Sequence, residues 1–183
     1  KSASGGFFVE LATFFFERYK ERCHVVGACL DGLKVNHIIV NKQSDLYLLQ
    51  GTKYMSSKID GVYTSVYQLL QKGDFVLFTG LPCQAYALKK YLNGKAYKGE
   101  LVICDLICNG VPSRKLLEID IKNNLHNINK IISFRDKVNG WKDCLAFTYE
   151  TTDKHVVRLD CKDSFFLNAF KVNYALRDSC YQC

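Results

Sequence analysis

The stretch that decides the fold is residues 75–92, FVLFTGLPCQAYALKKYL. Strand-forming residues lead into a Gly-x-Pro-Cys turn, and an amphipathic helix follows, whose predicted inner face consists of Ala85, Leu88 and Leu92. Pro82 suits the first helical turn because the N–H that proline lacks would have no partner there. Cys83 therefore lies at the positive end of the helix dipole, where a thiolate is favoured over a thiol. We expect its sulfur to be a metal ligand or a nucleophile.

A second apolar stretch, residues 101–107, follows this helix. The order strand, helix, strand predicts a right-handed crossover between two parallel strands. Cys83 follows the carboxyl end of the first strand, and Cys108 follows that of the second. Both cysteines are therefore expected at the carboxyl edge of the sheet, where open α/β folds bind their ligands. Cys104 lies inside the second strand and is expected to be a core residue.

The flanking segments complete the predicted fold. Further helices are expected at 7–19, 60–72 with Asp60 as its N-cap, 114–125 and 164–176, with a short strand or helix end at 46–49. Residues 23–30 and 34–40 predict a hairpin, and residues 127–161 alternate in the manner of strands. The predicted fold class is α/β, a partly parallel sheet with flanking helices and an added antiparallel strand region.

We expect residues 1–183 to form a single module that is a piece of a longer chain. Its N-terminal part, 1–57, carries a glycine loop and the hairpin, and its C-terminal part, 58–183, carries the cysteines discussed here. A hydrophobic fraction of 48% with 23% charged residues is ordinary for a soluble domain. No apolar run reaches the roughly 20 residues of a membrane helix, and the longest lacks the features of a signal peptide.

Charge and cysteine content limit the function classes. The net charge of +7 is spread along the chain, which favours an ordinary basic surface over a nucleic-acid interface. Nine cysteines, an odd number in a chain without a secretory segment, indicate reduced thiols rather than a disulfide framework. The expected location is the cytoplasm.

Cys180 and Cys183 form a Cys-x-x-Cys pair, which can bind one metal centre from a single turn. Together with Cys83 and Cys108 they make a candidate set of four thiolates. Such a set fits tetrahedral zinc or a [4Fe–4S] cluster, and ligand type alone does not separate the two. The alternatives are a frayed terminus with a buried Cys83 thiol, a nucleophilic Cys83, and a thioredoxin-like pair. The last is disfavoured because the pair ends a helix instead of opening one.

Two glycine loops are candidate phosphate or flavin sites. The first is Ser4-Gly5-Gly6, which opens a helix whose N–H groups can bind phosphate. The second is Gly51-Thr52-Lys53-Tyr54, which offers hydroxyl donors, a positive charge and an aromatic ring. A helix-capping loop and a plain surface loop are the alternatives.

Six motifs occur in a fixed order along nearly the whole chain. They are Ser4-Gly5-Gly6, Gly51-Thr52-Lys53-Tyr54, Gly80-Leu81-Pro82-Cys83-Gln84, Cys108-Asn109-Gly110-Val111-Pro112-Ser113, Phe134-Arg135-Asp136-Lys137 with Gly140-Trp141, and Cys180-Tyr181-Gln182-Cys183. Together they resemble the coenzyme F420 hydrogenase/dehydrogenase beta-subunit family. Asn109 departs from the histidine that many relatives have at this position.

Members of that family are flavoproteins that bind FAD and a [4Fe–4S] cluster, and the best known exchange a hydride with the deazaflavin F420. The resemblance implies that Cys83, Cys108, Cys180 and Cys183 are the cluster ligands. It also implies that the Ser4–Gly6 and Gly51–Tyr54 loops bind the flavin. The implied function is that of an oxidoreductase passing a hydride between a small substrate and FAD, with single electrons relayed through the cluster.

The hydride partner and the class of protein leave alternatives. F420 or a similar deazaflavin is the first choice, and a reductase of an unidentified metabolite in surface-polysaccharide synthesis, without F420, is the second. An alternative of another class is a non-enzymatic module with structural zinc on the four cysteines. Expected partners are a small-molecule hydride donor or acceptor and another redox subunit or ferredoxin-type domain, with no nucleic acid and no membrane span. The sequence assigns no catalytic residue.

Overall fold

The computed structural model describes residues 6–125, 127–136 and 146–183. The chain forms two compact units that interleave along the sequence. Unit 1 consists of Lys1–Cys29, Asn36–Gln50 and Ser57–Cys108, and unit 2 consists of Leu30–Val35, Gly51–Ser56 and Asn109–Cys183. None of the described helices is both long enough and apolar enough to cross a membrane.

Unit 1 is built on a four-stranded sheet with the strand order β2-β1-β3-β4. Its elements in chain order are α1 (Phe7–Tyr19), η1 (Lys20–Arg22), β1 (Cys23–Asp31), β2 (Lys34–Val40), η2 (Gln43–Leu49), α2 (Val62–Lys72), β3 (Phe75–Gly80), α3 (Pro82–Leu92) and β4 (Glu100–Asp105). The tip of the β1–β2 hairpin is assigned to unit 2.

The centre of the sheet is parallel. β1 pairs with β3 from Cys23 opposite Phe75, and β3 pairs with β4 from Phe75 opposite Glu100 to Gly80 opposite Asp105. The predicted strand-helix-strand unit with parallel strands is therefore confirmed, as is the predicted fold class. Because β3 and β4 end side by side, the chain leaves both strands at one edge of the sheet.

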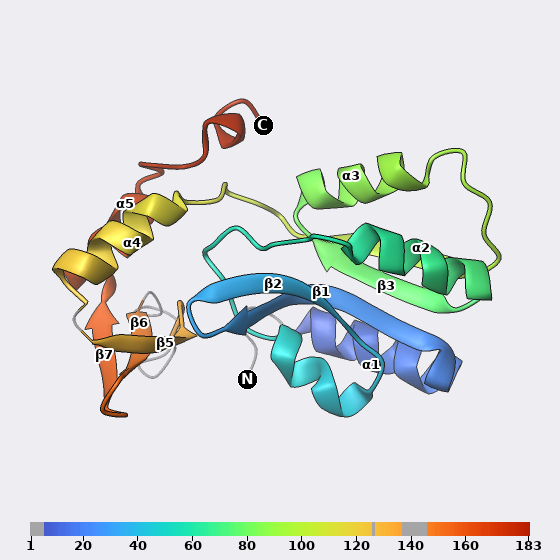
Figure 1. The fold of residues 1–183 in the computed structure, drawn as a ribbon, viewed down its shortest axis with the longest axis horizontal. Coiled ribbons are helices and arrows are strands. Elements are labelled where there is room, and N and C mark those ends of the chain that lie inside the picture. The colour runs from blue at the N-terminus through green and yellow to red at the C-terminus, as the bar shows by residue number, and fades with distance from the viewer. Residues whose placement is uncertain (1–5, 126, 137–145) are drawn as a thin grey trace. The chain divides into compact units, whose positions relative to one another are not determined.

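Helices cover both faces of this sheet (Figure 1). Phe75 and Leu77 of β3 pack with Ala12 and Phe16 of α1, together with residues of η2. The alternate β3 residues, Val76 and Phe78, lie in a second cluster formed with α2 and α3. Alternating side chains of one buried strand thus supply the cores on both faces, which explains why β3 is apolar throughout.

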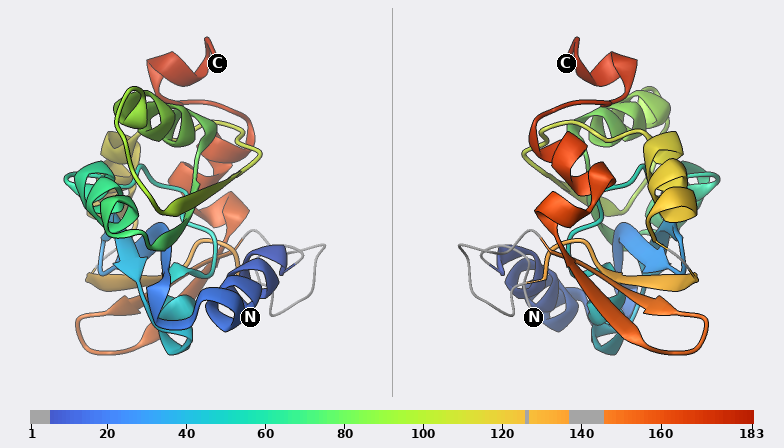
Figure 2. Two further views of the ribbon diagram at one scale, coloured as in Figure 1. Left: turned by 90° about the vertical axis from the view of Figure 1, so that its right-hand side faces the viewer. Right: turned by 90° about the vertical axis from the view of Figure 1, so that its left-hand side faces the viewer.

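Unit 2 contains a three-stranded antiparallel sheet in the order β5-β6-β7 (Figure 2). Its elements are α4 (Arg114–Asn123), β5 (Ile128–Ser133), β6 (Ala146–Thr151), β7 (Val156–Asp160), η3 (Cys161–Asp163), α5 (Phe165–Lys171) and η4 (Asp178–Cys180). The rings of Phe134, Phe147 and Phe166 are fully or almost fully buried and contact one another around Phe134. This is the added antiparallel region that the sequence predicts.

A buried carboxylate joins α4 to the start of α5. Asp120 of α4 has no exposed surface, and its Oδ2 accepts hydrogen bonds from the Ser164 hydroxyl and the Phe166 N–H, each at 3.0 Å. Its Oδ1 accepts a third bond from the Asn124 side chain at 2.7 Å. Ser164 is the N-cap of α5 and accepts from the Leu167 N–H. Unit 2 therefore fixes the beginning of α5 through one charged side chain.

Several predicted element boundaries are wrong. The N-cap of α2 is Gly61, at a φ of 74°, rather than Asp60, because the chain enters this helix through a left-handed residue. The strand predicted at 101–107 ends at Asp105, and residues 46–49 lie in a 3₁₀ helix. The helix predicted to end at residue 176 ends at Lys171, because Asn173 and Ala175 are left-handed and cannot continue it.

Cys23 at the start of β1 is fully buried, and burial raises the pKa of its thiol to about 12. Only the thiolate is alkylated, so we expect iodoacetamide at pH 8 to modify Cys23 roughly 100-fold or more slowly than exposed Cys83 in the folded, metal-free protein. Mass spectrometry with fragment-ion localisation measures both rates, and urea should remove the difference. Equal rates in the folded protein would contradict the burial. The stability contributed by the protonated thiol is full below pH 9, the ordinary value, and is lost as the pH rises toward 12.

Candidate functional site

The turn between β3 and α3 presents Cys83. Leu81 is the extended N-cap of α3, Pro82 is the first helical residue, and Cys83 follows with an exposed side chain. The N–H groups of the first turn have no carbonyl partner within the helix, and proline contributes none. The predicted environment of Cys83, at the positive end of a helix after a parallel strand, is therefore the observed one.

Gln84 and Tyr63 hold this turn in place. The Oε1 atom of Gln84 accepts a hydrogen bond from the Leu81 N–H at 2.9 Å, and its Nε2 donates to the Ser57 hydroxyl at 2.9 Å. Tyr63 of α2 donates its hydroxyl to the Gln84 carbonyl, also at 2.9 Å. Burial, and secondarily the negative charge of the Cys83 thiolate, raise the pKa of Tyr63. The tyrosine therefore stays a protonated donor next to the cysteine turn.

Cys108 leaves the same edge of the sheet as Cys83. The Leu106 N–H donates to the Gly80 carbonyl at 3.0 Å, which joins the chain beyond β4 to the end of β3. Leu106, Ile107 and Cys108 are then exposed. Within unit 1, the chain leads both predicted ligands away from adjacent strand ends, as the crossover argument expects.

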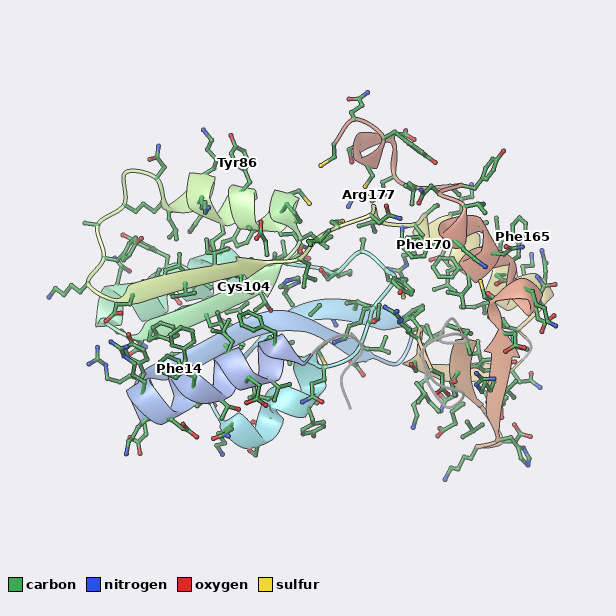
Figure 3. The ribbon with its side chains drawn as sticks, turned by 180° about the vertical axis from the view of Figure 1, so that it is seen from behind. Phe14, Tyr86, Cys104, Phe165, Phe170 and Arg177 are labelled. Atoms are coloured by element: carbon green, nitrogen blue, oxygen red, sulfur yellow. The ribbon has the colours of Figure 1, made fainter. Side chains whose placement is uncertain are left out.

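In unit 2, the segment that follows Cys108 pairs with the segment that precedes Cys180. Pro112 and Leu176 form an isolated antiparallel bridge. On either side of it, the Ser113 N–H donates to the Ala175 carbonyl at 2.8 Å, and the Arg177 N–H donates to the Val111 carbonyl at 3.0 Å. This short backbone pairing, 111–113 with 175–177, joins stretches about sixty residues apart in the sequence. Arg177 is labelled in Figure 3.

Tyr181 closes the loop that carries the Cys-x-x-Cys pair. Its hydroxyl accepts a hydrogen bond from the Leu176 N–H at 3.1 Å and donates to the Asn173 carbonyl at 3.0 Å. The side chain of Asn109 donates to that of Asn173 at 3.0 Å. Cys180, at the end of η4, is half-buried, and Cys183 is exposed. The residue between the two cysteines therefore fixes the path of the chain that leads to them.

Gly110 is required by the backbone pairing. Its φ is +99°, and a β-carbon placed there would lie 2.7 Å from Leu176 Cδ1. We expect Gly110→Ala to accelerate hydrogen exchange at Ser113 and Arg177 at least about tenfold, because the pairing must open to admit the methyl group. The matched control is Gly94→Ala, since Gly94 also has a positive φ, +74°, but has no atom within 4 Å of the added carbon. Unchanged exchange in Gly110→Ala would contradict the prediction.

The four predicted cluster ligands divide between the units. Cys83 and Cys108 belong to unit 1, and Cys180 and Cys183 belong to unit 2. Among the residues that the structure describes, no three His, Cys, Asp or Glu side chains form a group that could bind a metal. The four-thiolate set spans both units and stays a prediction.

The remaining cysteines contrast with the predicted ligands. Burial raises the pKa of Cys23, Cys104 and Cys161, which keeps them as thiols. Cys104, labelled on β4 in Figure 3, is half-buried and packs against the core on the α1 face. None of the eight cysteines within the described ranges forms a disulfide. The side chains of Cys83, Cys108 and Cys183 are exposed, as is needed for thiolates that meet a metal centre.

The glycine loops are placed only in part. Ser4 and Gly5 lie outside the described residues, and Gly6, at a φ of 86°, is the N-cap of α1. Gly51 is exposed with a φ of 82°, and Thr52, Lys53 and Tyr54 are half-buried. In unit 2 the Tyr54 ring packs against Phe170 at a centroid distance of 4.6 Å (Figure 3 labels Phe170). The predicted flavin contacts of these loops stay predictions.

Residues 73–183 match the family model that describes the C terminus of the coenzyme F420 hydrogenase/dehydrogenase beta subunit. This match covers more than half of the chain. The chain belongs to the coenzyme F420 hydrogenase/dehydrogenase beta-subunit family. It is a redox domain of an oxidoreductase-subunit family. All four predicted ligand cysteines lie in the matched part, whereas both glycine loops precede it.

A solved structure described as the xenon derivatization of the F420-reducing [NiFe] hydrogenase complex from Methanosarcina barkeri contains a chain of the same fold. The two chains have 19% sequence identity and a TM-score of 0.62. The likeness covers 100% of this family member and 60% of that chain, so the sequence spans about 60% of its relative's length. No curated protein matches the chain.

Sequence reasoning missed the residues that hold the cysteines of this family member. Gln84 occupies the third helical position, where glutamine often bonds the N-cap N–H, so its role had a readable signal. Ser57, Tyr63 and Tyr181 had none, because each acts through a hydroxyl contact with a residue distant in the sequence or across an irregular loop.

Proposed function

We propose that the chain is the flavin and iron–sulfur module of an oxidoreductase. It would pass a hydride between a small substrate and FAD, with single electrons relayed through a [4Fe–4S] cluster on Cys83, Cys108, Cys180 and Cys183. This goes beyond family membership, since the cofactors and the hydride chemistry are inferred from the residues and the resemblance.

The observation that carries the proposal is the backbone pairing 111–113 with 175–177. It begins three residues after Cys108 and ends three residues before Cys180. Within unit 1, the Leu106–Gly80 hydrogen bond joins the approach to Cys108 to the turn of Cys83. Each half of the cysteine set is thus linked by backbone bonds to the chain on either side of Cys108, which supports one shared metal centre.

The donor chemistry fits an iron–sulfur cluster. Four thiolates are the usual ligand set of a [4Fe–4S] cluster, and the exposed cysteines fit that use, whereas the buried thiols do not. When bound, FAD supplies hydride transfer and the cluster supplies one-electron transfer. Zinc would fit the same ligands but cannot carry electrons.

The chain's own residues would bind and orient the cofactors. The N–H groups at the start of α3 lie beside Cys83, where donors of this kind stabilise a thiolate. Tyr63 and Gln84 hold that turn rigid. Gly6 and Gly51 present backbone at left-handed positions suited to a phosphate, and Lys53 would neutralise phosphate or the charge of a reduced flavin ring.

The first-choice hydride partner is F420 or a related deazaflavin, because it is the coenzyme in the family's name. A second redox subunit is a reasonable partner, since the similar solved chain belongs to a hydrogenase complex. A metabolite reductase without F420 is the second choice. Reduction of purified F420, followed by its loss of absorbance under anaerobic conditions, separates these two substrates.

The deciding experiment is anaerobic purification followed by absorption spectroscopy and metal analysis. We expect bound flavin and about four iron atoms per chain, the content of one cubane cluster. Zinc on the four cysteines with no bound flavin, after anaerobic handling, would contradict the proposal and favour the structural module. Flavin without iron would contradict the ligand assignment alone.

A further inference from the structure

Gln84 connects the cysteine turn to the exit of the second glycine loop. Its amide oxygen binds the Leu81 N–H, two residues before Cys83, and its amide nitrogen donates to Ser57, three residues after Tyr54. All these groups belong to unit 1 except Tyr54, which belongs to unit 2. One half-buried side chain is therefore bonded both to the turn of a predicted cluster ligand and to the chain leaving a predicted flavin loop.

The surroundings leave Gln84 little freedom. A β-carbon at Gly80 would lie 3.0 Å from Gln84 Oε1 and 3.0 Å from a ring carbon of Phe78, so only glycine leaves room for the amide. Tyr63 fixes the Gln84 backbone through its carbonyl at 2.9 Å. On the other side of Gly80, His37 Nε2 lies 3.3 Å from the Thr79 carbonyl. Both ends of the glutamine are thus held.

We propose that Gln84 is a positioning residue that sets the place of the Cys83 sulfur and couples it to the flavin loop. This inference rests on the proposed function, because the sulfur must be a ligand for its position to matter to electron transfer. Gln84 touches neither cofactor in this proposal. It acts by keeping the Leu81 N–H and the Ser57 hydroxyl in fixed positions, so that the cluster ligand cannot move independently of the loop.

The first test uses hydrogen exchange on the full-length protein and needs no cofactor. We expect Gln84→Met, which keeps the side-chain volume but neither hydrogen bond, to accelerate exchange of the Leu81 amide at least tenfold. The matched control is Gln71→Met on α2, whose side chain donates only to Tyr67 at 3.0 Å. Equal Leu81 exchange in the two variants would overturn the proposal.

The second test uses the anaerobically purified holoprotein. We expect Gln84→Met to lose iron to a chelator at least threefold faster than Gln71→Met does. Gln84→Glu should restore wild-type retention, because a carboxylate can accept from both the Leu81 N–H and the Ser57 hydroxyl. Its added negative charge should still lower the cluster's reduction potential, measured by EPR-monitored titration. A role in folding alone would shift unfolding midpoints but not this potential.

The two proposals fail in different ways. If Cys83→Ser loses the cluster while Gln84→Met retains it like Gln71→Met, the role of Gln84 is wrong and the proposed ligand set stands. If Cys83→Ser keeps the cluster, the ligand set is wrong, and the positioning role falls with it even where Leu81 exchange is accelerated.

Discussion

Replacing Cys83 by serine is expected to remove the iron–sulfur signal from the protein, whereas replacing Cys104 by serine should leave it intact. Serine preserves the size of the side chain but is a poor ligand for the iron of a [4Fe–4S] cluster. Cys83 is exposed at the start of α3, where its sulfur is free to coordinate. Cys104 is half-buried in β4, and burial raises the pKa of its thiol.

The measurement is iron per chain, together with the visible absorption of anaerobically prepared protein. We expect Cys83→Ser to retain less than about a quarter of the wild-type iron, because a cubane that lacks one of its four thiolates is rapidly lost. Thermal unfolding should show that both variants fold. Equal iron loss in the two variants would mean that Cys83 has no special role.

Replacing Asp120 by alanine is expected to lower the free energy of unfolding by about 3 kcal/mol. Hydrogen bonds to a charged group contribute about 1.5–3 kcal/mol each, and buried donors left without a partner cost about 1–3 kcal/mol. Alanine would remove the acceptor of the Ser164 hydroxyl and the Phe166 N–H at a site with no exposed surface. Loss of the anchor would release the start of α5, the helix that precedes the segment leading to Cys180.

Urea denaturation followed by circular dichroism measures the effect. The matched control is Glu118→Ala on the same helix, since Glu118 is exposed and pairs only with Arg114 at i,i+4, a contribution of about 0.5 kcal/mol or less. Asp120→Asn keeps one acceptor oxygen and should fall between the two. If Asp120→Ala proves as stable as Glu118→Ala, the buried network does not anchor α5.

The β3–α3–β4 unit could be predicted because its signals are local. β3 is apolar at successive positions, Pro82 marks the helix start, and Ala85 and Leu88 recur at helical spacing. The structure buries both of these residues as expected. The end of β4 was misplaced for a physical reason, since Leu106 and Ile107 are apolar but exposed. The Leu106 N–H bonds the Gly80 carbonyl at a point where composition alone suggests that the strand continues.

The arrangement around the cysteines was predictable only in its ligands. The pairing of Val111 with Arg177 uses backbone groups of two irregular segments, which no periodicity in the sequence marks. The left-handed residues Asn173 and Ala175 shorten the last helix, yet neither is glycine, the residue that usually signals such a turn. Long-range contacts through hydroxyls, such as that of Tyr181, likewise follow from the folded chain rather than from local preference.

The interleaving of the two units constrains how this domain is inherited. β1 lies between β2 and β3 in the sheet, but the stretch that carries the family match begins only at residue 73, after both β1 and β2. Unit 2 likewise draws Leu30–Val35 and Gly51–Ser56 from the first third of the chain. A recombination point inside residues 30–108 would separate parts of one core, so the early hairpin and the late cysteine pair must be transmitted together. Gene fusion can therefore lengthen such a protein at its ends but cannot exchange either unit alone.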